Sequence, residues 1–288
     1  MKYEISKFSP AKLNLFLEII DKDKNGYHNL ESLMCFCDYG DSISVSRSDD
    51  LALEIEGPFS EFLENNENII MKTISMLQQY ADVKINVNIK LIKKLPIASG
   101  LGGGSSNAAT LLHCIIDLLK IEIKRDFNDF LFKIGADVPF CFYRKTAIVR
   151  GKGEKITFLK NKIPELYVLL VNPNIPISTK KTFENLNIKN YEKIKYPDKR
   201  MTDRDFLSFL SRKNNDLEAP AIKECDEVRR ILDKLNNETN SLLSRMTGSG
   251  ATCFALYNEK RKLLDAEEIM KKQSNDFWII KSKLINQL

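Results

Sequence analysis

Four of the five residues from Gly100 to Gly104 are glycines, and this cluster separates a strand pattern from a helix pattern. Ordering a glycine costs more backbone entropy than ordering any other residue, so the cluster needs a physical reason. Backbone N–H groups that converge closely on a ligand would supply one, and the start of the following helix adds N–H donors and partial positive charge. The ligand that suits this arrangement is a phosphate group.

Two familiar phosphate loops do not fit the spacing of these glycines. The Walker A loop requires a lysine directly after its last glycine, and none follows here. The dinucleotide-binding fingerprint requires Gly-x-Gly-x-x-Gly, but Ser105 or Asn107 occupies the position of its last glycine. A flexible glycine linker is the other alternative, and the regular patterns on both sides argue against it.

The segments around the cluster show regular hydrophobic patterns. Apolar and polar residues alternate from Ala11 to Ile19 and from Val83 to Leu91, which predicts two half-buried strands. Residues 68–80 and 107–120 carry apolar residues at helical spacing. This predicts two amphipathic helices, the second with Ser105 or Ser106 as its N-cap.

The remaining patterns predict a mixture of helices and strands. Helices are expected at 126–134, 202–212, 216–236 and 259–272, and strands at 141–149, 166–171, 252–257 and 277–281. The charged stretch from Lys189 to Arg204 is expected to be a surface loop. A polar turn at 161–164 separates two halves, so we expect a bilobal α+β protein with domains at 1–160 and 161–288.

Composition restricts the chemistry. The net charge of +5 suits an anionic small substrate as well as nucleic acid, so charge alone decides nothing. The six cysteines form no Cys-x-x-Cys pair and are expected to be reduced, buried thiols. The two histidines, His28 and His113, are too few for a histidine-rich metal site, and His113 is expected on the solvent face of its helix.

The sequence contains no membrane or export signal that we can identify. Its longest apolar run, residues 166–171, is far shorter than a bilayer span. The first five residues lack the apolar core of a signal peptide. We therefore expect a cytoplasmic protein.

Four motifs, in order along the chain, resemble those of the GHMP kinases. Residues 96–108, with paired serines after the glycines, resemble the ATP loop of that family, and the extra glycine is similar to the branch acting on 4-diphosphocytidyl-2-C-methyl-D-erythritol. Three more stretches resemble that branch or family: Ala11–Leu15 with Gly26-Tyr27-His28 downstream, Gly135–Phe140, and Gly248–Ala251 before Phe254. The resemblance covers nearly the whole chain.

This resemblance implies a two-lobed α+β GHMP kinase architecture. The expected N-terminal lobe is like the second domain of ribosomal protein S5, the C-terminal lobe is ferredoxin-like, and the active site lies in the cleft between them. The implied activity is ATP-dependent phosphorylation of the 2-hydroxyl of 4-diphosphocytidyl-2-C-methyl-D-erythritol, in the non-mevalonate route to isoprenoid precursors. Mg²⁺ is expected to arrive on ATP without a dedicated protein metal site. The expected partners are these small molecules, with neither nucleic acid nor membrane, and the protein is expected to be a monomer or homodimer.

The resemblance also assigns two catalytic residues. Asp137 is expected to accept the proton of the substrate hydroxyl or to orient that hydroxyl. Lys12 is expected to keep Asp137 ionised and to stabilise the developing alkoxide. Read locally, Asp137 is an Asx turn after a helix, and Lys12 is a solvated strand residue.

The binding residues follow from the same motifs. ATP is expected to contact the loop, with Lys93 and Asn68 as neighbours; the loop residues are Pro96, Ile97, Ala98, Ser99, Gly100, Leu101, Gly102, Gly103, Gly104, Ser105 and Ser106. Cytosine is expected to stack on Tyr27 and Phe183 and to hydrogen-bond His28, although Phe183 also reads as a core residue of a helix. The other expected acceptor contacts are Asn14, Thr179, Gly248, Ser249 and Gly250.

Two other functions are compatible with parts of the sequence. Another GHMP kinase, acting on homoserine or a mevalonate-type alcohol, would share the ATP loop but would have no need of Gly26-Tyr27-His28. A non-catalytic RNA-binding protein would share the topology of the N-terminal half. The absence of interleaved aromatic and basic stripes in the sequence argues against it.

Overall fold

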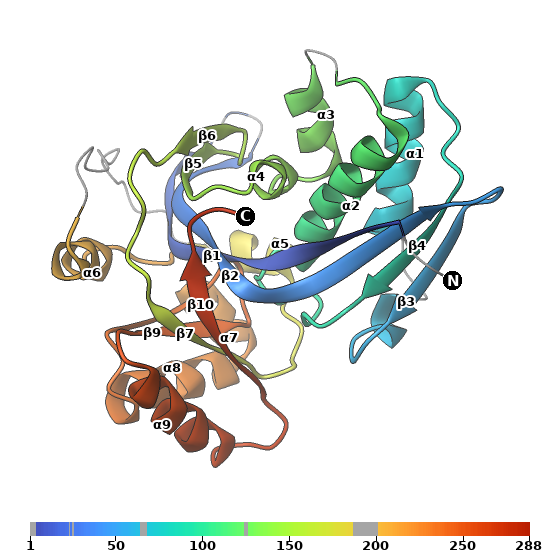
Figure 1. The fold of residues 1–288 in the computed structure, drawn as a ribbon. Helices are drawn as coiled ribbons and strands as arrows, with labels where there is room; N and C mark the ends of the chain where they lie inside the picture. Colours follow the sequence, from blue (N-terminus) through green and yellow to red (C-terminus); the bar gives the residue numbers. More distant parts are fainter. Residues whose placement is uncertain (1–3, 23, 25, 64–67, 124–125, 187–200) are drawn as a thin grey trace. The chain divides into compact units, whose positions relative to one another are not determined.

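The computed structural model describes residues 4–22, 24, 26–63, 68–123, 126–186 and 201–288. The chain divides into two compact units whose segments alternate along the sequence. The first unit comprises 1–11, 40–97 and 102–144, and the second comprises 12–39, 98–101 and 145–288. Two long strands, β1 (Ile5–Lys22) and β2 (His28–Arg47), each contribute residues to both units (Figure 1).

The first unit combines a small sheet with helices. The end of β2 pairs antiparallel with β4 (Val87–Ile92), which pairs in parallel with β3 (Ala52–Glu56). The helices are α1 (Ile69–Ala81), α2 (Gly103–Leu119), α3 (Phe127–Ile134) and α4 (Val138–Tyr143), with a short 3₁₀ turn at Glu61–Leu63. Helix α2 contacts α1 and α4, and the Cys114 thiol points to the carbonyl of Ile43 on β2. A largely apolar helix therefore packs directly on the sheet.

The second unit contains the larger sheet. Its strand order is β2-β10-β7-β9-β8, formed by β7 (Tyr167–Asn172), β8 (Leu243–Met246), β9 (Cys253–Tyr257) and β10 (Trp278–Ile285). Strand β2 also pairs with β5 (Ala147–Gly151), which pairs with β6 (Lys155–Phe158). All of these pairings are antiparallel.

Helices α8 (Asp226–Glu238) and α9 (Lys260–Lys271) pack on β7, β8 and β9 and on each other (Figure 1). Their apolar faces join the strands in one buried core that includes Leu169, Ala255 and Leu263. Three further helices of this unit are α5 (Thr179–Glu184), α6 (Asp203–Ser211) and α7 (Glu218–Glu224).

Most predicted elements are present, and the departures have local causes. The predicted helix at 216–236 is two helices, because Cys225 adopts an extended conformation between α7 and α8. The predicted strand at 141–149 is wrong: residues 138–143 form α4, whose second position is Pro139, and β5 begins only at Ala147. The predicted strand at 83–91 begins later, at Val87. Residues 189–200 of the predicted charged loop lie outside the described residues, and Asp203 and Arg204 belong to α6.

The alternation in β1 predicted one buried face, but both faces are buried. Lys12 is 4% exposed, and Asn14 and Glu18 are each 1% exposed. A buried charge requires a partner, and Glu18 pairs with Lys213, whose position in sequence is remote. In β4, by contrast, burial alternates as predicted.

All six cysteines are free and buried, as predicted. Among the described residues, no helix is both long and apolar enough to cross a bilayer. The predicted domain division at residue 160 stays a prediction, because each contact-based unit is assembled from several chain segments.

The prediction of a solvated His113 is wrong. Its ring stacks on Phe142 of α4 with centroids 4.2 Å apart, and its Nε2 lies 2.8 Å from the Phe142 carbonyl oxygen. Ser106 and Thr110, which lie on the same face of α2 as His113, are buried. Helix α4, which the sequence pattern did not predict, covers this side of α2.

We expect His113 to make stability depend on pH. Burial lowers the pKa of His113 below 6.5, so the unfolded chain takes up its proton at higher pH than the folded chain does. The contribution of the neutral ring is present above pH 6.5 and is lost as pH falls through the folded pKa. In urea titrations between about pH 7.5 and pH 5, the unfolding free energy of His113→Gln should decrease less with falling pH than that of the wild type. An unchanged slope would place the titrating group elsewhere.

Candidate active site

The glycine cluster forms the entry to helix α2. Gly102 is the N-cap residue with φ +63°, a left-handed conformation that glycine adopts without strain. The helix begins at Gly103, so the predicted N-cap at Ser105 or Ser106 is wrong and both serines lie within the first turns. No acidic residue lies in the first turn, and the first N–H groups of a helix have no acceptor within it. The loop therefore presents donors and partial positive charge to an anion.

Lys93 lies beneath this helix start. Its ammonium Nζ is 2.6 Å from Asp41 Oδ2, and a Cβ atom on Gly103 would be 3.2 Å from the same Nζ. Burial lowers the pKa of Lys93, although the Asp41 carboxylate opposes that shift. The other predicted ATP neighbour, Asn68, caps α1 by accepting a hydrogen bond from the Ile70 N–H at 3.0 Å.

Asp137 stands at the N-cap position of α4, half-buried and within the first unit. Its side chain makes no capping hydrogen bond to α4. The helix therefore does not start with an Asx turn of Asp137. The preceding glycine, Gly135, is close to α2: a Cβ there would be 3.8 Å from Ser105 Oγ. The start of α4 and the start of α2 thus lie beside each other.

Lys12 belongs to the second unit, where it contacts the middle of the glycine loop. Its Nζ donates to Asn14 Oδ1 at 2.7 Å and to the Gly100 carbonyl at 3.3 Å, while its backbone N–H donates to the Leu101 carbonyl at 2.8 Å. Lys12 and Asn14 therefore lie on one side of the strand, as the alternation from Ala11 to Ile19 predicts. The ammonium is buried, so the interpretation of Lys12 as a solvated strand residue is wrong.

The C-terminal glycine motif packs against the same segment. Gly248 would place a Cβ atom 2.8 Å from the Gly100 carbonyl oxygen, and Thr247 Oγ1 accepts a hydrogen bond from the Asn14 N–H at 2.9 Å. Ser249 and Thr179 share a hydrogen bond of 2.8 Å between their hydroxyls. Two motifs separated by about half the chain therefore meet at Gly100.

The aromatic residues predicted to surround a base lie partly together. The rings of His28 and Phe183 stack with centroids 5.2 Å apart and planes inclined by 29°. Tyr27 is 60% exposed, and the Lys152 ammonium lies 4.2 Å from its ring centre. Burial, together with nearby Lys22, lowers the pKa of His28, so the neutral imidazole is favoured. Neutral imidazole carries one hydrogen-bond donor and one acceptor.

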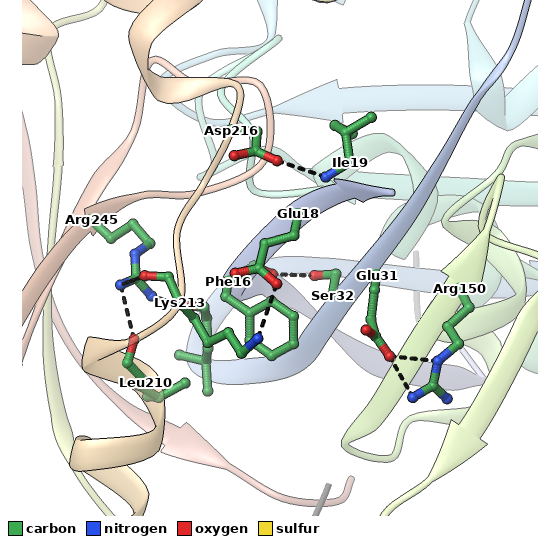
Figure 2. A network of polar contacts seen from close by, with 11 residues as sticks. Phe16, Glu18, Ile19, Glu31, Ser32, Arg150, Leu210, Lys213, Asp216 and Arg245 are labelled. Atoms are coloured by element: carbon green, nitrogen blue, oxygen red, sulfur yellow. Dashed lines mark hydrogen bonds and ion pairs between the residues drawn. The ribbon is translucent and has the colours of Figure 1, made fainter. Parts of the chain in front are cut away.

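A polar network behind β1, which the sequence did not reveal, anchors this unit. Figure 2 shows Arg245 reaching the carbonyl of Leu210, Lys213 pairing with Glu18, and Asp216 accepting from the Ile19 N–H. The buried side chain of Asn215 donates to the carbonyls of Met246 and Gly248, each at 2.8 Å. These long-range contacts fix the 247–250 turn relative to β1. No local pattern in the sequence indicates them.

Comparison with known proteins identifies the family. The model for the GHMP kinases N terminal domain matches residues 68–145, and the model for the GHMP kinases C terminal matches residues 204–276. The 4-diphosphocytidyl-2-C-methyl-D-erythritol kinase of Wolbachia pipientis wMel is 33% identical over 284 residues, covering 96% of this chain and 97% of the relative. The chain belongs to the GHMP kinase family.

Solved structures of GHMP kinases agree with this assignment. A crystal structure of 4-(cytidine 5'-diphospho)-2C-methyl-D-erythritol kinase superimposes with a TM-score of 0.78 and 26% identity, covering 97% of this chain and 99% of that one. The homoserine kinase from Cytophaga hutchinsonii, at 19% identity, shares the fold with a TM-score of 0.73, covering 100% and 96% of the two chains. The two-lobed α+β GHMP kinase architecture predicted from the sequence is thereby confirmed.

The structure of this GHMP kinase groups the predicted site residues within each unit. In the first unit, the start of α2 lies beside Lys93 and the segment that carries Asp137. In the second unit, Gly100 lies beside Lys12 and the 247–250 turn. That Lys12 and Asp137 act on one hydroxyl stays a prediction. Among the described residues, no group of three or more His, Cys, Asp and Glu side chains is arranged to hold a metal ion.

Proposed function

We propose that this GHMP kinase transfers the γ-phosphoryl group of ATP to the 2-hydroxyl of 4-diphosphocytidyl-2-C-methyl-D-erythritol, giving the 2-phosphate and ADP. The observation that carries the proposal is the near-complete coverage by relatives that are named for this reaction. The Gly26-Tyr27-His28 motif and the stacked His28 and Phe183 rings support a cytosine-bearing acceptor. The reaction belongs to the non-mevalonate route to isoprenoid precursors.

The nucleotide is held by the loop from Pro96 to Ser106. The backbone N–H groups at the start of α2 donate to phosphate oxygens, and the helix dipole favours their negative charge. ATP enters as its Mg²⁺ complex, because Mg²⁺ readily remains bound through phosphates and water with few protein ligands. Bound to ATP, the ion would neutralise charge that develops on the phosphates.

Lys12 and Asp137 act on the acceptor hydroxyl. Lys12, already hydrogen-bonded to Asn14, supplies a buried positive charge beside the loop. Asp137 accepts the hydroxyl proton as the oxygen attacks phosphorus, or orients that oxygen for attack. Asn14 binds the methylerythritol end, and Thr179 with residues 248–250 completes the acceptor site.

The wider organisation is proposed on the same basis. Residues 1–160 form the N-terminal GHMP kinase domain and 161–288 the C-terminal one, and the matched segments 68–145 and 204–276 fall on either side of that division. We place the protein in the cytoplasm, acting on small molecules as a monomer or homodimer.

Turnover with three acceptors tests the proposed function. ADP release should be fast with 4-diphosphocytidyl-2-C-methyl-D-erythritol and close to the background ATPase rate with homoserine and mevalonate. Faster turnover of homoserine or mevalonate would assign the chain to another branch of the family. No turnover of any of the three would refute the proposal.

Removing an aromatic ring that is expected to stack on cytosine should weaken acceptor binding without affecting ATP binding. Base stacking is worth about 1–3 kcal/mol, which corresponds to about 5- to 150-fold in affinity. Phe183→Ala and Tyr27→Ala, which remove the two rings expected to stack on cytosine, should therefore raise the KM for the cytidyl acceptor at least about fivefold and leave the KM for ATP close to wild type. Tyr39→Leu, which disturbs the aromatic pair of Tyr39 and Trp278, is the matched control. Wild-type acceptor KM in both variants would place the base elsewhere.

A further inference from the structure

The carboxylate of Asp41 is fully buried in the first unit, at 0% exposure, and four donors converge on it. Oδ2 accepts from Lys93 Nζ at 2.6 Å and from Asn107 Nδ2 at 3.0 Å. Oδ1 accepts from the backbone N–H groups of Lys94 at 2.6 Å and Leu95 at 2.8 Å. Hydrogen bonds to an ionised acceptor are stronger than neutral ones, so this cluster is a rigid point in the fold.

The donors belong to both ends of the nucleotide loop. Lys94 and Leu95 immediately precede Pro96, where the loop begins, whereas Asn107 lies in α2, just after the paired serines. Asn107 continues the connection, because its Oδ1 accepts a hydrogen bond from Ser9 Oγ at 2.6 Å, and Ser9 Oγ lies 3.0 Å from Ser106 Oγ. One carboxylate on β2 thus joins the chain entering the loop to the helix leaving it.

Asp41 also neutralises a cation that lies beside the helix start. Lys93 is 3% exposed, and its ammonium approaches Gly103, the first residue of α2. An ammonium buried without a counter-charge is strongly unfavourable. The carboxylate therefore allows a lysine side chain to pack tightly beneath the backbone that faces the phosphates.

We propose that Asp41 is a positioning residue for ATP: it holds the two ends of the loop at the separation at which the α2 amides converge on phosphate. Asp41 does not touch the nucleotide. The inference rests on the proposed function, and it adds a residue that no motif of the sequence indicated. It predicts that loss of Asp41 weakens ATP binding more than it weakens acceptor binding.

The first test is Asp41→Asn, assayed by calorimetric titration with Mg·ATP in the absence of acceptor. The amide keeps one acceptor oxygen, but its NH₂ group faces donors, so at least one contact becomes repulsive. We expect the Kd for ATP to rise about tenfold or more, the equivalent of one strong contact, with the acceptor KM within about twofold of wild type. A merely structural role would reduce the fraction of active protein and leave the Kd of that fraction unchanged.

Glu18→Gln is the matched control. Glu18 is a similarly buried carboxylate that pairs with a lysine, Lys213, at 3.1 Å, but it belongs to the second unit. We expect Glu18→Gln to lower the melting temperature while its Kd for ATP stays within about twofold of wild type, a difference of well under 1 kcal/mol. An equal loss of ATP affinity in both variants would overturn the inference, because the effect would then be general.

Asn107→Leu keeps the test decisive if Asp41→Asn does not fold. This variant leaves the Asp41–Lys93 ion pair in place and removes the bond from the helix to Oδ2, together with the bond that Asn107 Oδ1 accepts from Ser9 Oγ. Its Kd for ATP should rise at least threefold; an unchanged Kd would overturn the inference. Failure of the proposed function would give a different result: the wild-type protein would bind ATP but would not phosphorylate the cytidyl acceptor.

Discussion

Replacing Asp137 with asparagine should lower kcat by about two to four orders of magnitude while the Kd for ATP stays close to wild type. The amide has the size of the carboxylate but cannot accept the proton that leaves the attacking hydroxyl. Asp137 stands at the start of α4, two residues after Gly135, which lies close to Ser105, and the loss of one charge there need not disturb the fold. Single-turnover phosphorylation of the cytidyl acceptor, with calorimetric ATP binding in parallel, measures both quantities.

The matched control for this prediction is Asp129→Asn. Asp129 lies in the first turn of α3, is exposed and belongs to the same unit. Its removal should leave kcat within about twofold of wild type, as for most surface substitutions. If Asp137→Asn also retained wild-type kcat, the catalytic assignment of Asp137 would be wrong.

A second substitution separates the two roles considered for Asp137. Alanine removes both proton acceptance and hydroxyl orientation, whereas asparagine can still orient the hydroxyl by a hydrogen bond. If Asp137→Asn is as slow as Asp137→Ala, proton acceptance dominates. If asparagine restores most of the rate, orientation dominates, as expected for a loose phosphoryl-transfer transition state.

Sequence analysis succeeded where the structure of a segment is determined by residues within that segment. The glycine cluster between two patterned elements predicted a loop that leads into a helix, which is the start of α2, and alternation along β1 placed Lys12 and Asn14 on one side. Helix α1 begins one residue after Asn68, the residue that caps it, as a local polar signal before an apolar run predicts. Such features depend on neighbours a few residues apart, and these are legible in a single sequence.

Sequence analysis failed where a residue depends on a distant partner. The polar face of β1 is buried because Lys213 pairs with Glu18 and Asp216 binds the Ile19 N–H, contacts that span about two hundred residues. Asp41 is one of three carboxylates in β2, with Glu31 and Asp38, so the sequence alone did not single it out; its donors come from residues 93–95 and 107. Helix α4 was missed because its aromatic residues favour strands, although Pro139 near its start favours a helix.

Gly100→Ala should remove most activity and destabilise the protein. Gly100 adopts φ +78°, a left-handed conformation that costs alanine about 1–2 kcal/mol. A Cβ atom there would also overlap the backbone oxygen of Thr247, and it would lie 3.1 Å from Gly250 N. Relieving that overlap must separate the loop from the 247–250 turn and shift the carbonyl that Lys12 contacts. We expect kcat/KM for ATP to fall at least about 100-fold, which is about 2.7 kcal/mol of lost transition-state stabilisation.

Gly104→Ala distinguishes this steric effect from a general intolerance of side chains in the loop. The nearest atom to a Cβ on Gly104 is Ile69 Cγ2 at 3.8 Å, an ordinary contact, and the residue lies in the first turn of α2. Alanine there should leave the melting temperature unchanged or raise it, because alanine is favoured over glycine in helices by roughly 0.5–1 kcal/mol. The KM for ATP of this variant then reports how closely phosphate approaches the helix, without the folding defect. Equal melting temperatures for the two variants would contradict both the contact of Gly100 with the 247–250 turn and its left-handed backbone, because these two features separate the substitutions.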